Sequence, residues 1–123
     1  MNFQGISWAG LYVSNLPGMI VFYERVLGLT VVTQGAGFCL MNAGGGGLFE
    51  LWDDGLSVPR RKTASEQSMI IGFAVQSLEP AIAELLSRGL KADSDVGCYG
   101  DSRWIYYVDP EGNRFELKET GRG

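Results

Sequence analysis

The chain contains two copies of one pattern. Residues 10–16 (GLYVSNL) align with residues 72–78 (GFAVQSL), and the tripeptide FEL occurs at 49–51 and again at 115–117. The copies of each pattern lie about sixty residues apart, so a unit of roughly that length fills the chain twice. The duplication restricts the fold to one in which the same order of strands and helices occurs twice.

Each copy opens with a strand. Leu11 and Val13 alternate with other residues in the first copy, and Phe73 and Val75 do so in the second. A period of two is typical of a strand with one buried face.

A helix follows the strand in each copy. The first is expected to be capped by Ser14 or Asn15 and to end at Gly28. The second is expected to be capped by Ser77 and to end at Gly89. The apolar side chains expected to face the sheet are Ile20, Tyr23, Val26 and Leu27 in the first helix and Leu78, Ile82, Leu85 and Leu86 in the second.

Three further strands complete each copy. They are clearest at the end of the chain, where residues 103–108 and 114–119 flank the turn sequence DPEGN. Residues 42–47 occupy the same place in the first copy. The unit therefore has the order β-α-β-β-β.

The sequence predicts an α+β fold with two βαβββ modules in tandem, residues 1–56 and 69–123, within a single domain spanning 1–123. Residues 57–68 are polar and contain Arg60, Arg61 and Lys62, so we expect a solvated linker between the modules. Four strands cannot bury both of their faces alone. We therefore expect the modules to form one curved mixed sheet, shaped as a cup, with the helices outside.

Composition excludes several classes of function. The chain is 46% apolar and 20% charged, has a net charge of −4 and contains no histidine, which excludes most zinc sites and catalytic triads. The acidic balance argues against nucleic acid as a partner. No apolar stretch is long enough for a bilayer span or a signal sequence, so we expect a cytoplasmic protein without a membrane partner. Cys39 and Cys98 receive no role.

Two motifs resemble those of a known family. Residues 22–29 (FYERVLGL) are similar to the first-helix signature, and residues 109–117 (DPEGNRFEL) to the closing hairpin, of the vicinal oxygen chelate superfamily. This glyoxalase, bleomycin-resistance and dioxygenase family includes enzymes as well as drug-binding proteins without catalysis. The resemblance implies the glyoxalase/bleomycin-resistance fold.

The resemblance also locates a metal site. In metal-using members, one ligand comes from the first strand and one from the fourth strand of each module. The corresponding first-strand residues here are Trp8 and Ile70, neither of which can ligate a divalent ion. Glu50 and Glu116 occupy the fourth-strand positions, which leaves two carboxylates. We therefore expect no metal and no cofactor.

Strand alternation places a set of aromatic side chains around the two glutamates on the inner face of the cup. Indole and phenol rings beside carboxylates suit an aromatic or cationic ligand. The expected ligand-binding residues are Trp8, Tyr12, Phe38, Leu40, Glu50, Trp52, Ile70, Trp104, Tyr106, Arg114 and Glu116. The alternative is that the two glutamates bind no ligand and that their carboxylates are instead paired with Arg114, Arg103, a tyrosine or water.

The leading interpretation is a metal-independent small-molecule-binding protein of the bleomycin-resistance type. It would hold a small hydrophobic or cationic aromatic molecule in a tryptophan-lined cup and form a homodimer. The first alternative is a glyoxalase-like or dioxygenase-like lyase or isomerase that uses Glu50 or Glu116 as a general base, with or without a weakly held divalent metal. The second is an interaction domain whose cup is filled by side chains.

Overall fold

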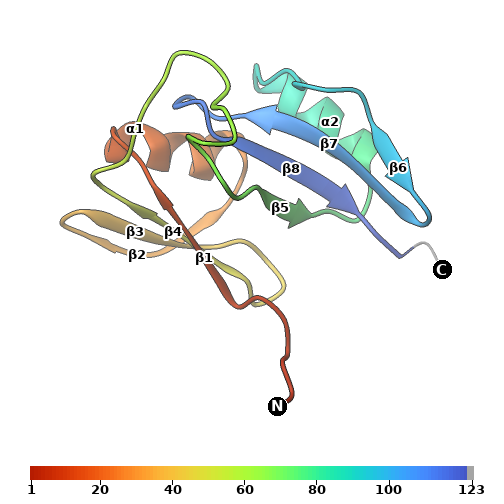
Figure 1. The fold of residues 1–123 in the computed structure, drawn as a ribbon, viewed down its shortest axis with the longest axis horizontal. Coiled ribbons are helices and arrows are strands. Elements are labelled where there is room, and N and C mark those ends of the chain that lie inside the picture. The colour runs from red at the N-terminus through yellow and green to blue at the C-terminus, as the bar shows by residue number, and fades with distance from the viewer. Residues whose placement is uncertain (122–123) are drawn as a thin grey trace. The chain divides into compact units, whose positions relative to one another are not determined.

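The chain folds into two compact units that share one order of elements. A computed structural model describes residues 1–121, which divide into residues 1–57 and residues 58–121 (Figure 1). Each unit contains a strand, a helical segment and three more strands, and each builds one four-stranded mixed sheet. The predicted α+β fold with tandem βαβββ modules is confirmed. That the two sheets together form one cup stays a prediction.

The first unit holds its strands in the order β1-β4-β3-β2. The first strand runs parallel to the fourth, and the other neighbours are antiparallel. Its elements are β1 (Trp8–Tyr12), α1 (Leu16–Val21), the π-helix η1 (Phe22–Val26), β2 (Thr30–Gly35), β3 (Phe38–Asn42) and β4 (Leu48–Trp52).

The second unit repeats this arrangement with the order β5-β8-β7-β6. Here too the first strand is parallel to the last, and the remaining pairs are antiparallel. Its elements are β5 (Ile71–Ala74), α2 (Leu78–Ser87), β6 (Gly97–Tyr99), β7 (Ser102–Val108) and β8 (Arg114–Glu119). The registers agree as well, because Gly10 lies opposite Glu50 in the first unit and Gly72 lies opposite Glu116 in the second.

The first helix buries a different stripe from the expected one. Asn15 caps it, since its Oδ1 accepts a hydrogen bond from the Gly18 backbone N–H at 3.2 Å. Tyr23 is buried as expected, whereas the other expected residues Ile20, Val26 and Leu27 are only half-buried. The remaining buried side chains are Leu16, Met19 and Phe22. The π-helical turn of η1 adds a residue to the turn and so rotates Val26 and Leu27, whereas Ile20 lies in the regular helix before it.

The second helix is capped from a distant strand. Ser77 occupies the N-cap position, but its side chain makes no capping hydrogen bond. The buried carboxylate of Glu119 accepts a hydrogen bond from the Leu78 N–H at 2.7 Å instead. Leu78 and Leu85 face the sheet, whereas Leu86 is 61% exposed, so its expected place in the stripe is wrong.

The segment expected to be a solvated linker is mostly exposed, but residues 58–62 within it form an ordered strap and Lys62 is buried. Residues 58–62 cross the 109–113 turn. The Val58 N–H donates a hydrogen bond to the Glu111 carbonyl, and the Lys62 N–H donates one to the Gly112 carbonyl. The Lys62 side chain is 8% exposed, and its Nζ donates to Asn113 Oδ1 at 2.7 Å. Gly112 has φ 90°, and a Cβ there would lie 2.2 Å from the Arg60 carbonyl oxygen. Only glycine therefore fits beneath the strap.

Candidate functional site

One face of the first sheet carries all six of the site residues predicted for that unit. The opposite face is covered by the helical segment and contains the buried residues of β3 and β4. The register places Gly10, Glu50 and Leu40 in one row across three strands. The next row contains Tyr12, Trp52 and Phe38. Alternation has therefore brought together Trp8, Tyr12, Phe38, Leu40, Glu50 and Trp52.

Trp8 and Glu50 interact directly. The indole Nε1–H donates a hydrogen bond to Glu50 Oε1 at 2.9 Å. The indole ring lies over Gly10, where an added Cβ would be 2.4 Å from the Trp8 Cη2 atom. The glycine thus makes room for the ring, and the ring positions the carboxylate.

Aromatic surface continues along the same face. The rings of Tyr12 and Trp52 are tilted at 57° with centroids 6.5 Å apart. Trp8 is 47% exposed, Tyr12 64% and Trp52 42%. Large aromatic side chains at these exposures form an apolar patch of the kind that marks binding surfaces.

The corresponding face of the second sheet carries the other glutamate. Gly72, Glu116 and Tyr106 form one row, which is equivalent to the row through Glu50. Trp104 lies in the next row and packs over Gly97, where an added Cβ would be 2.6 Å from the indole. All these positions are on the face away from the buried residues of β7 and β8.

The arginines that could have neutralised Glu116 interact elsewhere. The guanidinium of Arg114 lies 3.7 Å from the centroid of the Tyr106 ring. Arg103 pairs with Glu79 and with Glu119. Within residues 1–121 the Glu116 carboxylate forms no hydrogen bond and no ion pair. Neither arginine therefore satisfies this carboxylate.

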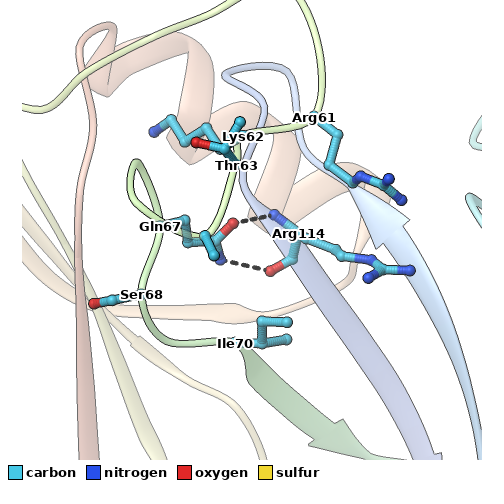
Figure 2. A pocket seen from close by; sticks show the side chains of 8 residues that line it. Arg61, Lys62, Thr63, Gln67, Ser68, Ile70 and Arg114 are labelled. Carbon is cyan, nitrogen blue, oxygen red and sulfur yellow. Dashed lines mark hydrogen bonds between the residues drawn. The ribbon is translucent and has the colours of Figure 1, made fainter.

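Ile70 differs from the other predicted residues because it lies just before β5 and is 47% exposed. It borders a pocket that also includes Arg114 (Figure 2).

Sequence reasoning missed several residues near the site. Lys118 lies opposite Trp104 on the same face, and Gln67 and Asp93 contact Arg114. Gln67 and Asp93 are far from β8 in sequence, so no local spacing could reveal them. A signal did exist for Gly10 and Gly72, which occupy equivalent places in the duplicated pattern.

The two thiols lie outside these faces or at their edge. Cys39 is fully buried in β3, and burial, followed by the charges of Glu24 and Glu50, raises its pKa. A raised pKa keeps the thiol protonated and unreactive at neutral pH. Cys98 is exposed in β6, and neither cysteine forms a disulfide.

The donor set does not fit a divalent metal. At the first-strand position of the first unit, Trp8 offers a hydrogen-bond donor to Glu50 and no ligand atom. Each face therefore contributes one carboxylate, far fewer than the roughly six to eight oxygen ligands that surround Ca²⁺. Among residues 1–121 there is no group of three or more histidine, cysteine, aspartate or glutamate side chains that could hold an ion.

These features place the chain in a family of proteins with duplicated βαβββ modules. Residues 5–117 match the Glyoxalase/Bleomycin resistance protein/Dioxygenase superfamily. The chain belongs to this superfamily, and no curated protein matches its sequence.

Solved structures share the fold. A putative glyoxalase family protein from Bacillus anthracis is 20% identical, with a TM-score of 0.77 and 98% of both chains covered. A glyoxalase/bleomycin resistance protein/dioxygenase from Nocardioides is 22% identical, with a TM-score of 0.74, covering 100% of this chain and 87% of the other. The fosfomycin resistance protein FosX from Listeria monocytogenes, complexed with Mn(II) and a dihydroxypropylphosphonic acid, is 19% identical with a TM-score of 0.71, covering 98% and 94%. Identities this low support the fold alone.

No helix within residues 1–121 has the length and apolar character needed to cross a bilayer.

Proposed function

We propose that this chain is a metal-independent small-molecule-binding protein of the bleomycin-resistance type, with an aromatic or amphipathic ligand and a preference for a cationic one. The observation that carries the proposal is the hydrogen bond of 2.9 Å from the Trp8 indole to the Glu50 carboxylate. At a position where metal-using relatives supply a ligand, this chain supplies an aromatic ring that contacts the carboxylate. The site is thereby suited to stacking and to a positive charge.

The first unit supports aromatic recognition. Tyr12 and Trp52 present two tilted rings beside Glu50 on an exposed face. An aromatic cation that stacks on an indole gains about 0.5 to 2 kcal/mol, depending on how much water is removed. A carboxylate next to the rings adds attraction for the charge.

The second unit supports cation recognition. Glu116 forms no hydrogen bond or ion pair within residues 1–121, and Tyr106 and Trp104 lie on the same face. A half-buried carboxylate without a partner is costly, and a bound cation or amine would offset that cost. The net charge of −4 attracts such a ligand at longer range.

One observation favours the enzymatic alternative. The same lack of a partner leaves the Glu116 carboxylate able to accept a proton from a bound substrate. A lyase or isomerase with Glu116, or its equivalent Glu50, as general base is therefore the second candidate. Turnover of a ligand found by binding would identify it.

The proposal includes a homodimer that acts in the cytoplasm. Each sheet taken by itself has two edge strands, β1 and β2 in the first unit and β5 and β6 in the second. A symmetric dimer is the commonest way to cover such edges and the apolar side chains near them.

The binding proposal is tested by tryptophan fluorescence with two probes of the same shape. Phenyltrimethylammonium carries a positive charge, and tert-butylbenzene is its neutral isostere. We expect the cation to quench saturably, because Trp8, Trp52 and Trp104 all lie on the candidate faces. Trp104→Ala should weaken the binding several-fold.

The charge is tested by a matched pair of variants. Glu116→Gln should lower the affinity for the cation and leave the affinity for the neutral isostere unchanged. Glu84→Gln, on α2, should change neither affinity. Absence of saturable quenching across cationic and neutral aromatic compounds, or an equal effect of the two variants, would show that the site is placed wrongly.

A further inference from the structure

A pocket in the second unit brings two arginines together. It has a volume of about 340 Å³ and lies between the segment that precedes β5 and the start of β8. Figure 2 shows the guanidinium groups of Arg61 and Arg114 on the same side of the pocket, beyond Gln67 and Ile70. Three of the eight lining residues are cationic and none is acidic.

The structure fixes the position of Arg114. Its backbone N–H donates to Gln67 Oε1 at 2.7 Å, and Gln67 Nε2 donates to its carbonyl oxygen at 2.7 Å (Figure 2). The Gln67 amide thus continues the strand pairing that begins at Ile71. The guanidinium is held against the Tyr106 ring.

The structure also fixes the backbone that carries Arg61. The next residue, Lys62, is bound to the 109–113 turn through both its backbone N–H and its side chain. The Arg61 side chain is half exposed, and its Nη1 donates to Asp93 Oδ2 at 3.0 Å. The same carboxylate oxygen lies 3.8 Å from Arg114 Nε. Two arginines held by separate elements therefore converge on one oxygen.

Asp93 leaves most of the donors of this pair unused. Each guanidinium has five N–H groups. Within the described part of the chain, the guanidiniums of Arg61 and Arg114 form no hydrogen bond other than the one to Asp93. The three groups together retain a net positive charge. The Arg61–Asp93 pair is half exposed, and such pairs contribute little to stability.

We propose that Arg61 and Arg114 form a binding site for an oxyanion, a phosphate, phosphonate or carboxylate group. Planar guanidiniums bind such groups by paired, charge-assisted hydrogen bonds, and fixed positions reduce the entropy lost on binding. Asp93 occupies one edge of the site as an internal competitor. The inference goes beyond the proposed function, because it depends on neither the tryptophans nor the glutamates.

Calorimetric titration of the intact chain with inorganic phosphate tests the proposal, with sodium chloride used to hold the ionic strength constant. Arg61→Ala should raise the Kd for phosphate at least about tenfold, whereas Arg88→Ala, at the C-terminal end of α2, should leave it unchanged. Asp93→Asn should increase the affinity for phosphate several-fold because it removes the competing negative charge. A purely structural Asp93 would give lower stability in this variant and no gain in affinity.

A second ligand distinguishes the two sources of the oxyanion. Phenylphosphonate that binds no more tightly than phosphate indicates a site for a free anion. Phenylphosphonate that binds at least tenfold more tightly indicates the anionic group of an aromatic ligand. Either result supports the site if Arg61→Ala also raises the Kd of the ligand that binds. The proposed oxyanion site is overturned if neither compound binds saturably, or if Arg61→Ala and Arg88→Ala lower the affinity equally. Neither result affects the phenyltrimethylammonium test.

Discussion

Gly72 provides the space that the Glu116 carboxylate occupies. An added Cβ at Gly72 would lie 2.8 Å from Glu116 Oε1, and the flexible end of the glutamate can move away. We therefore expect Gly72→Ala to fold with a small loss of stability and to displace the carboxylate. The affinity for phenyltrimethylammonium should fall several-fold, as measured by fluorescence quenching.

The control for this change is Gly44→Ala on the hairpin tip of the first unit. Nothing lies near an added Cβ there, although the positive φ of 86° adds backbone strain. Gly44→Ala should therefore lower stability without changing affinity. If Gly72→Ala left the affinity unchanged, Glu116 would have no part in binding.

Glu66 makes the stability of the second unit depend on pH in the acidic range. Its side chain accepts hydrogen bonds from Arg60, and this contact, followed by the Thr63 backbone N–H, lowers the pKa of Glu66 to about 2. A depressed carboxylate pKa stabilises the fold above the unfolded value of 4.5, and this contribution is lost as the pH falls toward 2. Denaturation by urea should thus become easier across this window.

Glu66→Gln should flatten that part of the pH profile. Glu24→Gln, a change on the helical segment of the first unit, is the matched control and should leave the profile intact. An unchanged profile in Glu66→Gln would mean that the Arg60–Glu66 contact is absent in solution.

The strap of residues 58–62 is the element that sequence reasoning described least well. Lys62 is buried and bonded to Asn113, within a turn whose Asp109 accepts hydrogen bonds from Glu111 and Asn113. Lys62→Met keeps the aliphatic stem and removes the charge, which leaves buried polar groups without a donor. We expect a loss of about 1 to 3 kcal/mol in the free energy of unfolding.

Urea denaturation measures this loss. Lys91→Met, at an exposed position, should change the free energy of unfolding by less than about 0.5 kcal/mol. If both variants changed the free energy of unfolding by the same small amount, the Lys62 side chain would be solvated and not buried in the strap.

Elements that depend on local pattern could be predicted from the sequence. The period of two located the strands around Leu11 and Phe73, and the repeated FEL tripeptide put Glu50 and Glu116 at equivalent positions. The features that were missed depend on residues far apart in the chain. Glu119 caps α2 from β8, and the strap crosses a turn about fifty residues away.

The candidate site could be predicted in part for the same reason. Alternation along each strand correctly grouped the aromatic side chains on one face of each sheet, because a strand fixes its own faces. It could not show that the Trp8 indole bonds to Glu50, or that the Arg114 guanidinium lies over the Tyr106 ring. Those choices depend on rotamers and on neighbours from other strands.

At the scale of the whole molecule, exposed apolar side chains support the proposed dimer. Phe3, Ile6 and Val32 are more than half exposed in the first unit, as is Leu86 in the second. Sedimentation should give a species of twice 13.4 kDa at micromolar concentration. A monomer at every concentration tested would contradict the dimer.

The most direct test of the central claim is whether binding needs a metal. We predict that a calorimetric titration of phenyltrimethylammonium gives the same Kd, within about twofold, in the presence of EDTA and in the presence of Mn(II), since each face offers a single carboxylate and Trp8 contacts one of them. Thermal stability should likewise be unaffected by Mn(II), although an ion at one hundred times its Kd would add about 2.7 kcal/mol. Binding that appears only with Mn(II), together with a stabilisation by the ion that Glu116→Gln abolishes, would contradict the account.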